Sequence, residues 1–384
     1  MEYYLILLLL SIVGLFLSYN KQKTLSILMI IFMSGICCLR GVDVGTDTIT
    51  YMNFSMGLDT DGFGPLYSLF AFFAQLTPFP PTVFLTIISI LTYIPLLIIC
   101  SKYSKMPCLT LFLFMSTTAI YFLETFNICR QALAIMYVLL AIIQYDEKGN
   151  ENEFYTIRQI HNVKTGKGNI YQKTSFSNKT ISISLLCFAF LAHPYTILIA
   201  PLFILKNINL TRDKMMLYMV ISVFLGLFVS EYVMTFLISI LSMLFGGSSS
   251  YLLSHLTKYT TYDFSSEYTF IGKVAHILPY IFLLLFTYRK EYANTLIYKM
   301  MFWGFVLLSI SLSSIFSERI ACTYTIAIIV ALPNIYFSLT KRQKMYTFLV
   351  FAYLVYRYIS DMQVMALSNL NYPVPYKFIF ENGI

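Results

Sequence analysis

Long apolar stretches, separated by short polar segments, dominate the chain. The clearest of them cover residues 3–19, 25–39, 81–100, 107–123 and 215–245. A helix needs roughly 20 mostly apolar residues to cross the hydrocarbon core, and about ten or eleven stretches approach that length, some of them short or broken. The strict two-residue alternation of a membrane barrel is absent. The pattern predicts an all-α integral membrane protein, with residues 1–384 forming a single polytopic membrane domain.

Composition agrees with a membrane protein, because 58% of the residues are hydrophobic and only 11% are charged. Soluble domains carry about 25% charged residues. The net charge of +8 resembles that of a nucleic-acid-binding protein. The distribution of the basic residues along the chain, described next, explains this positive charge better, and we expect no nucleic-acid partner.

The basic residues gather in segments between the apolar stretches, as they do in cytoplasmic loops. These clusters are Lys21/Lys23, Lys102/Lys105, six residues from Lys148 to Lys179, Lys206/Arg212/Lys214, Arg289/Lys290 and Lys341/Arg342/Lys344. Residues 41–80 contain four Asp and no Lys or Arg. We therefore expect a polar cytoplasmic loop at 146–180, and segments 40–80, 246–272 and 368–384 at the outer face.

Residues 181–205 lie between two basic stretches, although the segment is long enough for one crossing. Pro194 removes a backbone donor and disfavours helix at the preceding residue, His193. A re-entrant hairpin with His193 near its tip would return the chain to the cytoplasm. A single kinked crossing is the alternative, and we prefer the hairpin.

This topology brings three arginines to the outer level, against the usual distribution of charge. Arg40 ends the second apolar segment, Arg130 lies just inside an outward turn, and Arg319 follows Glu318 at an outer helix end. An arginine inside a membrane helix costs about 2.5–3.5 kcal/mol, so such residues indicate function. Guanidinium groups bind phosphate oxygens in pairs and stay charged. We predict that the three arginines bind a lipid pyrophosphate.

Ordinary structural roles compete with this interpretation. Arg40 can snorkel at a helix end, and Arg130 can pair with Glu124. His193 alone is more often a hydrogen-bonded interior histidine than a catalyst. Asp47 can cap a short helix, or else Asp47 or Asp43 can point into a polar cavity.

A second charged pair lies in the last apolar segment, where Arg357 precedes Asp361 by one helical turn. We favour an internal ion pair there.

Several sequence blocks together resemble one family. LRGVDVGTDTITY resembles a signature of the EpsG family of bacterial polysaccharide polymerases, relatives of the Wzy-type O-antigen polymerases. NICRQALA, LAHPYTILIAPLFIL, SERIACTYTIAIIVALP and NLNYPVPYKFIF agree in order, so the resemblance runs from about residue 36 to 378. The polar insertion at 146–180 is longer than expected, and His193-Pro194-Tyr195 departs from the usual His-x-Ser.

The resemblance implies a GT-C-like glycosyltransferase bundle in the bacterial plasma (inner) membrane, with its active site facing the periplasm or cell exterior. Such an enzyme joins lipid-linked oligosaccharide repeat units, carried on polyprenyl pyrophosphate, and a flippase and a chain-length regulator are candidate partners. We expect no metal or other cofactor, since no Walker motif or nucleotide-binding glycine loop occurs. A polysaccharide ligase and a non-enzymatic transporter of an anionic lipid-linked sugar are the alternatives.

Glycosyl transfer also needs a base for the proton of the acceptor hydroxyl. The catalytic candidates, in order, are Asp47, Glu318, His193 and Asp43. Weaker candidates for contact with the substrate are Tyr51, Gln131, Tyr324 and Arg357.

Overall fold

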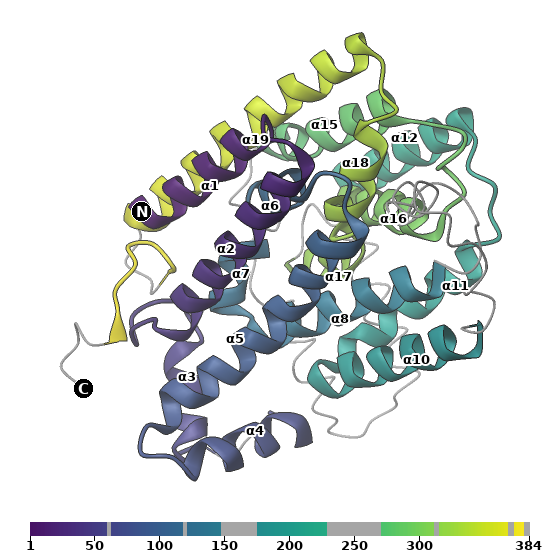
Figure 1. Ribbon diagram of the computed structural model, residues 1–384. Coiled ribbons are helices and arrows are strands. Elements are labelled where there is room, and N and C mark those ends of the chain that lie inside the picture. Colours follow the sequence, from purple (N-terminus) through teal and green to yellow (C-terminus); the bar gives the residue numbers. More distant parts are fainter. Residues whose placement is uncertain are drawn as a thin grey trace, which may run out of the picture. The chain divides into compact units, whose positions relative to one another are not determined.

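The computed structural model describes separate stretches of the chain, and helices provide nearly all of their regular structure (Figure 1). The described residues are 1–59, 63–117, 121–146, 175–228, 270–310, 315–367 and 372–379. Within these ranges the β-type pairing is an isolated antiparallel bridge between Arg40 and Phe378. The predicted all-α class is therefore confirmed.

Several predicted segments fall outside the described residues. Most of the expected cytoplasmic loop at 146–180 and of the outer segment at 246–272 lies there, and the expected outer tail is described for residues 372–379. The expected outer segment 40–80 holds two helices, α3 (Thr48–Ser55) and α4 (Pro65–Gln75).

The chain divides into two compact units, and the first is built from residues 1–197, 328–340 and 351–384. Besides α3 and α4, its elements are α1 (Glu2–Gly14), α2 (Tyr19–Cys38), α5 (Pro80–Ile98), the π-helix η1 (Ile99–Tyr103), α6 (Pro107–Ser116), α7 (Tyr121–Asn127), α8 (Cys129–Asp146), α10 (Ser175–Ala192), α18 (Ile328–Tyr336) and residues 351–367 of α19 (Lys341–Leu367).

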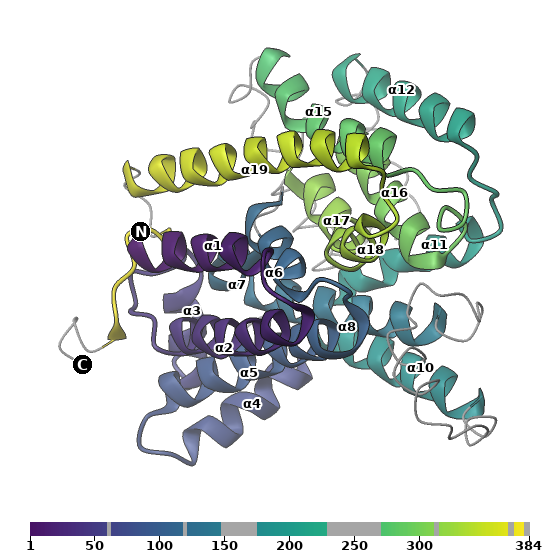
Figure 2. The same ribbon diagram turned by 45° about the horizontal axis from the view of Figure 1, so that its top comes forward.

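Inside this unit α2 packs on α5, and α5 packs on α4 and on α8 (Figure 2). Small residues allow the close contact of α2 and α5, since the Ser89 hydroxyl donates to the Ser34 carbonyl at 2.9 Å. Helix α10 lies along α8, where the Ser182 hydroxyl donates to the Ala141 carbonyl at 2.8 Å. Helix α3 also packs on α5, and the candidate site lies at the N-terminal ends of α3 and α8.

The second unit covers residues 198–327 and 341–350. Its helices are α11 (Ala200–Leu205), α12 (Arg212–Phe228), α15 (Phe270–Thr287), α16 (Leu296–Ile310) and α17 (Ile315–Thr325). Helix α16 contacts the other four. Its approach to α17 requires Gly304, because a Cβ there would lie 2.5 Å from the backbone nitrogen of Thr325.

Several helices suit a membrane by length and composition. Among the described residues, the spans Tyr19–Cys38, Pro80–Tyr103 and Glu318–Tyr336 are long and apolar enough to cross, and the bent pair α6 and α7, at 72° to each other, forms a fourth candidate. Further apolar helices are shorter. Many large apolar side chains are also exposed, among them Phe16, Ile204 and Leu367. The chain is a multi-pass membrane protein, and the exact number of crossings stays a prediction.

The predicted break near His193 is present. Helix α10 ends at Ala192, and the 3-10 helix η2 (Pro194–Ile199) begins at the proline. The choice between a re-entrant hairpin and a kinked crossing stays a prediction.

Candidate functional site

The loop that follows α2 is docked against the turn between α7 and α8. Gly45 adopts φ +91°, and a Cβ there would lie 2.4 Å from the Phe126 carbonyl oxygen. Only glycine fits both the left-handed backbone and this close approach. The Thr46 backbone N–H donates to Asn127 Oδ1 at 3.2 Å, which fixes the loop from the other side. Residues 39–47, here called the Gly45 loop, therefore have one defined position.

Arg40, at the start of this loop, points inward and is only 2% exposed. Its terminal nitrogens donate to the Thr125 carbonyl at 3.4 Å and to Cys129 Sγ at 3.0 Å. The guanidinium also lies 5.7 Å from the centre of the Phe126 ring. The side chain thus joins the end of α7 to the start of α8 and does not snorkel to a surface.

The structure shows no counter-charge for Arg40 among the side chains that it describes, which do not include that of Glu124, the predicted alternative partner of Arg130. No described carboxylate lies within ion-pair distance of Arg40, and its Nε has no hydrogen-bond partner among the described residues. Thr125, which accepts from Arg40 through its carbonyl, also joins a buried network with Cys37 and Tyr93 (3.1 Å each). A buried cation among neutral groups is costly, so a functional reason for its retention is expected.

Arg130 lies in the first turn of α8, next to the thiol that Arg40 contacts. It is half-buried, and its guanidinium stacks 4.9 Å from the centre of the Phe63 ring. Its backbone N–H donates to the Tyr51 hydroxyl at 3.4 Å. Burial raises the pKa of Tyr51, although the Arg130 charge opposes the rise, so the phenol stays protonated. Tyr51 therefore offers a neutral hydroxyl beside a cation.

A second buried tyrosine faces the same region. Tyr67 of α4 is fully buried, and its hydroxyl has no hydrogen-bond partner among the described residues. Sequence analysis missed it, since a tyrosine in an apolar stretch looks like ordinary packing.

The two aspartates of the loop have different surroundings. Asp47 occupies the N-cap position of α3, but its side chain makes no capping bond and accepts instead from the Thr46 hydroxyl at 3.4 Å. Asp43 is 46% exposed and lies 3.5 Å from Lys377. Asp47 thus has a half-buried carboxylate close to Tyr51, whereas Asp43 faces the C-terminal segment.

That segment, residues 372–379 and here called the C-terminal strap, lies along the Gly45 loop. The Gly41 N–H donates to the Lys377 carbonyl at 2.8 Å, and the Ile379 N–H donates to the Leu39 carbonyl at 2.9 Å. The strap is further held by the Tyr376 hydroxyl, which donates to the Ile36 carbonyl at 2.8 Å, and burial raises the pKa of this phenol. The strap therefore pairs with the backbone on both sides of Arg40, at Leu39 and Gly41.

Of the remaining candidates of the first unit, Gln131 directly follows Arg130 in α8, whereas His193 and Arg357 lie outside that helix. The His193 ring packs edge-on against Tyr195, with centroids 4.9 Å apart, at the end of α10. Gln131 is buried on α8. Arg357 Nε lies 3.8 Å from Asp361 Oδ2, one turn away on α19, which confirms the predicted internal ion pair.

Glu318, Arg319 and Tyr324 belong to α17 in the second unit. Glu318 Oε1 lies 4.0 Å from His276 Nε2 of α15, a histidine that sequence analysis did not single out. The Tyr324 hydroxyl donates to the Leu198 carbonyl at 2.7 Å, so its role in this structure is to anchor the chain before α11. The common pyrophosphate site of Arg319 with Arg40 and Arg130 stays a prediction.

One family's sequence model covers most of the chain, matching residues 23–157 and 171–378. The chain belongs to the EpsG family. The resemblance inferred from the sequence blocks is therefore confirmed. Comparison with curated proteins and with solved structures gives no significant match. The EpsG match contains the Gly45 loop, the turn between α7 and α8, and the strap as far as Phe378.

EpsG membership associates this multi-pass membrane protein with a polymerase-like role in polysaccharide biosynthesis. The site of the first unit supplies chemistry that suits such a role. A buried and a half-buried guanidinium favour a ligand with several negative charges. A half-buried carboxylate and a protonated phenol next to them can accept and donate hydrogen bonds to sugar hydroxyls.

Proposed function

We propose that this EpsG-family protein is a membrane glycosyltransferase that joins polyprenyl-pyrophosphate-linked oligosaccharide repeat units into a surface polysaccharide at the outer face of the bacterial plasma membrane. The main support is that the Arg40 guanidinium contacts the thiol of Cys129, the residue before Arg130, and has no carboxylate partner among the described side chains. Positive charge from two arginines near this turn favours a dianion or polyanion. A pyrophosphate at the membrane surface has the required charge.

In the proposed reaction an acceptor hydroxyl oxygen attacks the anomeric carbon of the donor. The bond between that carbon and the pyrophosphate oxygen breaks, and polyprenyl pyrophosphate leaves with the electron pair. The acceptor proton passes to a carboxylate, for which Asp47 is the first candidate. A cation near the leaving group lowers the barrier because negative charge grows there in the transition state.

The two arginines have different parts in this proposal. Arg130 is half-buried and contacts the pyrophosphate directly, while Tyr51 fixes the backbone at Arg130. Arg40 is almost fully buried, so it acts as a positioning residue that holds the α7–α8 turn and adds positive potential from behind. Asp43, His193, Glu318 and Arg319 stay sequence-based candidates, each of which the same assay can test.

The experiment uses the purified full-length protein in proteoliposomes with a polyprenyl-pyrophosphate-linked repeat unit, and the products are separated on a gel. Wild-type protein is expected to give a ladder of increasing chain length. Arg130→Ala and Asp47→Asn should each reduce ladder formation about 100-fold, the usual loss when a charge-stabilising or proton-transferring group is removed.

Arg342→Ala is the matched control, because Arg342 is exposed and its Nε donates to Tyr346 on the same helix at 3.0 Å. It should leave the ladder unchanged. Full-length ladders from Arg130→Ala and Asp47→Asn would refute the assigned site. Movement of the lipid-linked unit across the bilayer by wild-type protein, without any ladder, would refute the polymerase and favour a transporter.

A further inference from the structure

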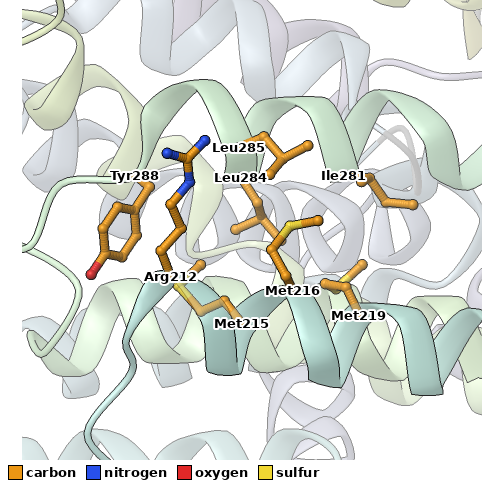
Figure 3. A pocket seen from close by; sticks show the side chains of 8 residues that line it. All are labelled: Arg212, Met215, Met216, Met219, Ile281, Leu284, Leu285 and Tyr288. Atoms are coloured by element: carbon orange, nitrogen blue, oxygen red, sulfur yellow. The ribbon is translucent and has the colours of Figure 1, made fainter.

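An apolar groove runs between α12 and α15 in the second unit (Figure 3). One wall consists of three methionines of α12, and the other consists of aliphatic side chains of α15. The methionines are Met215, Met216 and Met219, and the facing side chains are Ile281, Leu284 and Leu285. Unbranched, polarizable methionine side chains adapt to a flexible chain that lies against them.

Both polar groups of the groove lie at one end of it. Arg212 is the first residue of α12, and Tyr288 follows the last residue of α15, so the two helices run antiparallel along the groove. Figure 3 shows the Arg212 side chain reaching from α12 toward α15, with Met219 and Ile281 at the opposite end. The groove is therefore amphipathic along its length, with a guanidinium and a phenol at one end and only apolar groups beyond.

The outer surface around the groove is apolar. Large side chains of α12 are exposed, with Leu217 at 56% and Val220 at 62%, and Phe282 of α15 is exposed at 38%. In a multi-pass membrane protein such a surface faces lipid tails. A groove that opens onto it is therefore covered by hydrocarbon chains and not by water.

Charge at the polar end favours an anionic headgroup. The segments before α12 and after α15 are tied together by the Leu210 N–H, which donates to Asn294 Oδ1 at 3.3 Å. Together they carry more basic than acidic residues, namely Lys206, Arg212, Lys214, Arg289 and Lys290 against Asp213 and Glu291. Basic pockets between membrane helices are known to hold anionic lipid headgroups.

We propose that one anionic phospholipid lies over this groove, with its phosphate on the Arg212 guanidinium and one acyl chain against Met216 and the exposed apolar side chains beside it. Tyr288 donates a second hydrogen bond to the headgroup. The groove is too narrow to enclose the lipid, so the lipid covers α12 and α15 from outside and stabilises their packing. The proposal uses none of the residues assigned to glycosyl transfer and does not depend on that function.

The test is native mass spectrometry of the full-length protein from mixed micelles that contain phosphatidylglycerol and phosphatidylcholine in equal amounts. Wild-type protein should retain one phosphatidylglycerol with about a fivefold preference over phosphatidylcholine, the factor expected for one arginine near an anionic headgroup. Arg212→Gln should abolish the preference. Met216→Trp, at a partly exposed position in the groove wall, should reduce the number of retained lipids of both kinds.

Lys214→Gln is the matched control, since Lys214 is exposed, has the same charge and does not line the groove. It should keep the preference of the wild type. Equal retention of both lipids by wild-type protein would overturn the proposal. So would an equal loss of preference in Arg212→Gln and Lys214→Gln, because diffuse attraction to basic residues would then explain the binding.

Discussion

The backbone N–H of Gly41 donates a 2.8 Å hydrogen bond to the carbonyl of Lys377, a residue close to the other end of the sequence. Together with the reverse bond from Ile379 to Leu39 it forms the antiparallel bridge that places the strap beside Arg40. The Lys377 side chain then reaches Asp43, but this ion pair is about half exposed and contributes little stability. Backbone pairing and buried aromatic contacts hold the strap in place.

Tyr376→Phe should therefore destabilise the protein by about 1 kcal/mol, the usual contribution of one hydrogen bond. The change removes the donor to the Ile36 carbonyl and keeps the ring, which packs on Phe378 with centroids 5.0 Å apart. Denaturant unfolding in detergent measures the effect. Tyr372→Phe is the control, because no hydrogen bond of the Tyr372 hydroxyl occurs within the described residues, and equal losses in both variants would show that the Tyr376 bond is unimportant.

Gly45→Ala should destabilise the protein by at least about 1–3 kcal/mol, the cost of a non-glycine residue in a left-handed conformation. The added methyl would also collide with the Phe126 carbonyl, 2.4 Å away, and would push the Gly45 loop off α7. We expect ladder formation to fall in the same variant, because the loop carries Arg40 and Asp47.

The control for this substitution is Gly35→Ala. Gly35 lies inside α2, and a Cβ there would meet nothing within 4 Å. Alanine is the better helix former, so this variant should be as stable as wild type or slightly more stable. A Gly45→Ala protein with wild-type stability would contradict the described loop conformation.

The sequence predicted those features that depend on neighbouring residues. Apolar stretches located α2 and α5, Pro194 located the break after α10, and the i,i+4 spacing of Arg357 and Asp361 predicted their ion pair. Each of these depends on helical periodicity or on the conformation of proline, both of which are local properties.

Contacts between distant residues were not predictable in the same way. Arg40 and Thr125 are 85 residues apart, and Ile36 and Tyr376 are 340 apart. Pattern alone does not indicate which helix faces which, so the burial of Arg40 and the position of the strap were missed. The strap could have been suspected from its aromatic residues, which are unusual in a polar tail.

Arg40→Met tests whether the buried charge is retained for function. Replacing a buried, uncompensated cation by an apolar side chain of similar length is often neutral or stabilising, so the free energy of unfolding should change by less than about 1 kcal/mol. Ladder formation should nevertheless fall about 100-fold, because the positive potential at the α7–α8 turn is lost. Arg40→Lys keeps the charge and should retain part of the activity. Two results together would indicate a purely structural arginine: a destabilisation of several kcal/mol by Arg40→Met, and an Arg40→Lys protein that is equally inactive.

Glu318→Gln separates the alternative catalytic carboxylate from Asp47. Glu318 and His276 lie 4.0 Å apart with side chains 39% and 13% exposed, so their mutual interaction should contribute less than about 1 kcal/mol. Denaturant unfolding of Glu318→Gln, His276→Gln and the double variant should therefore give a coupling energy below that value.

If Glu318 is the base, Glu318→Gln should reduce ladder formation about 100-fold with nearly unchanged stability, while His276→Gln should have a smaller effect. Normal ladders from Glu318→Gln, together with loss in Asp47→Asn, would assign proton transfer to the carboxylate of the Gly45 loop.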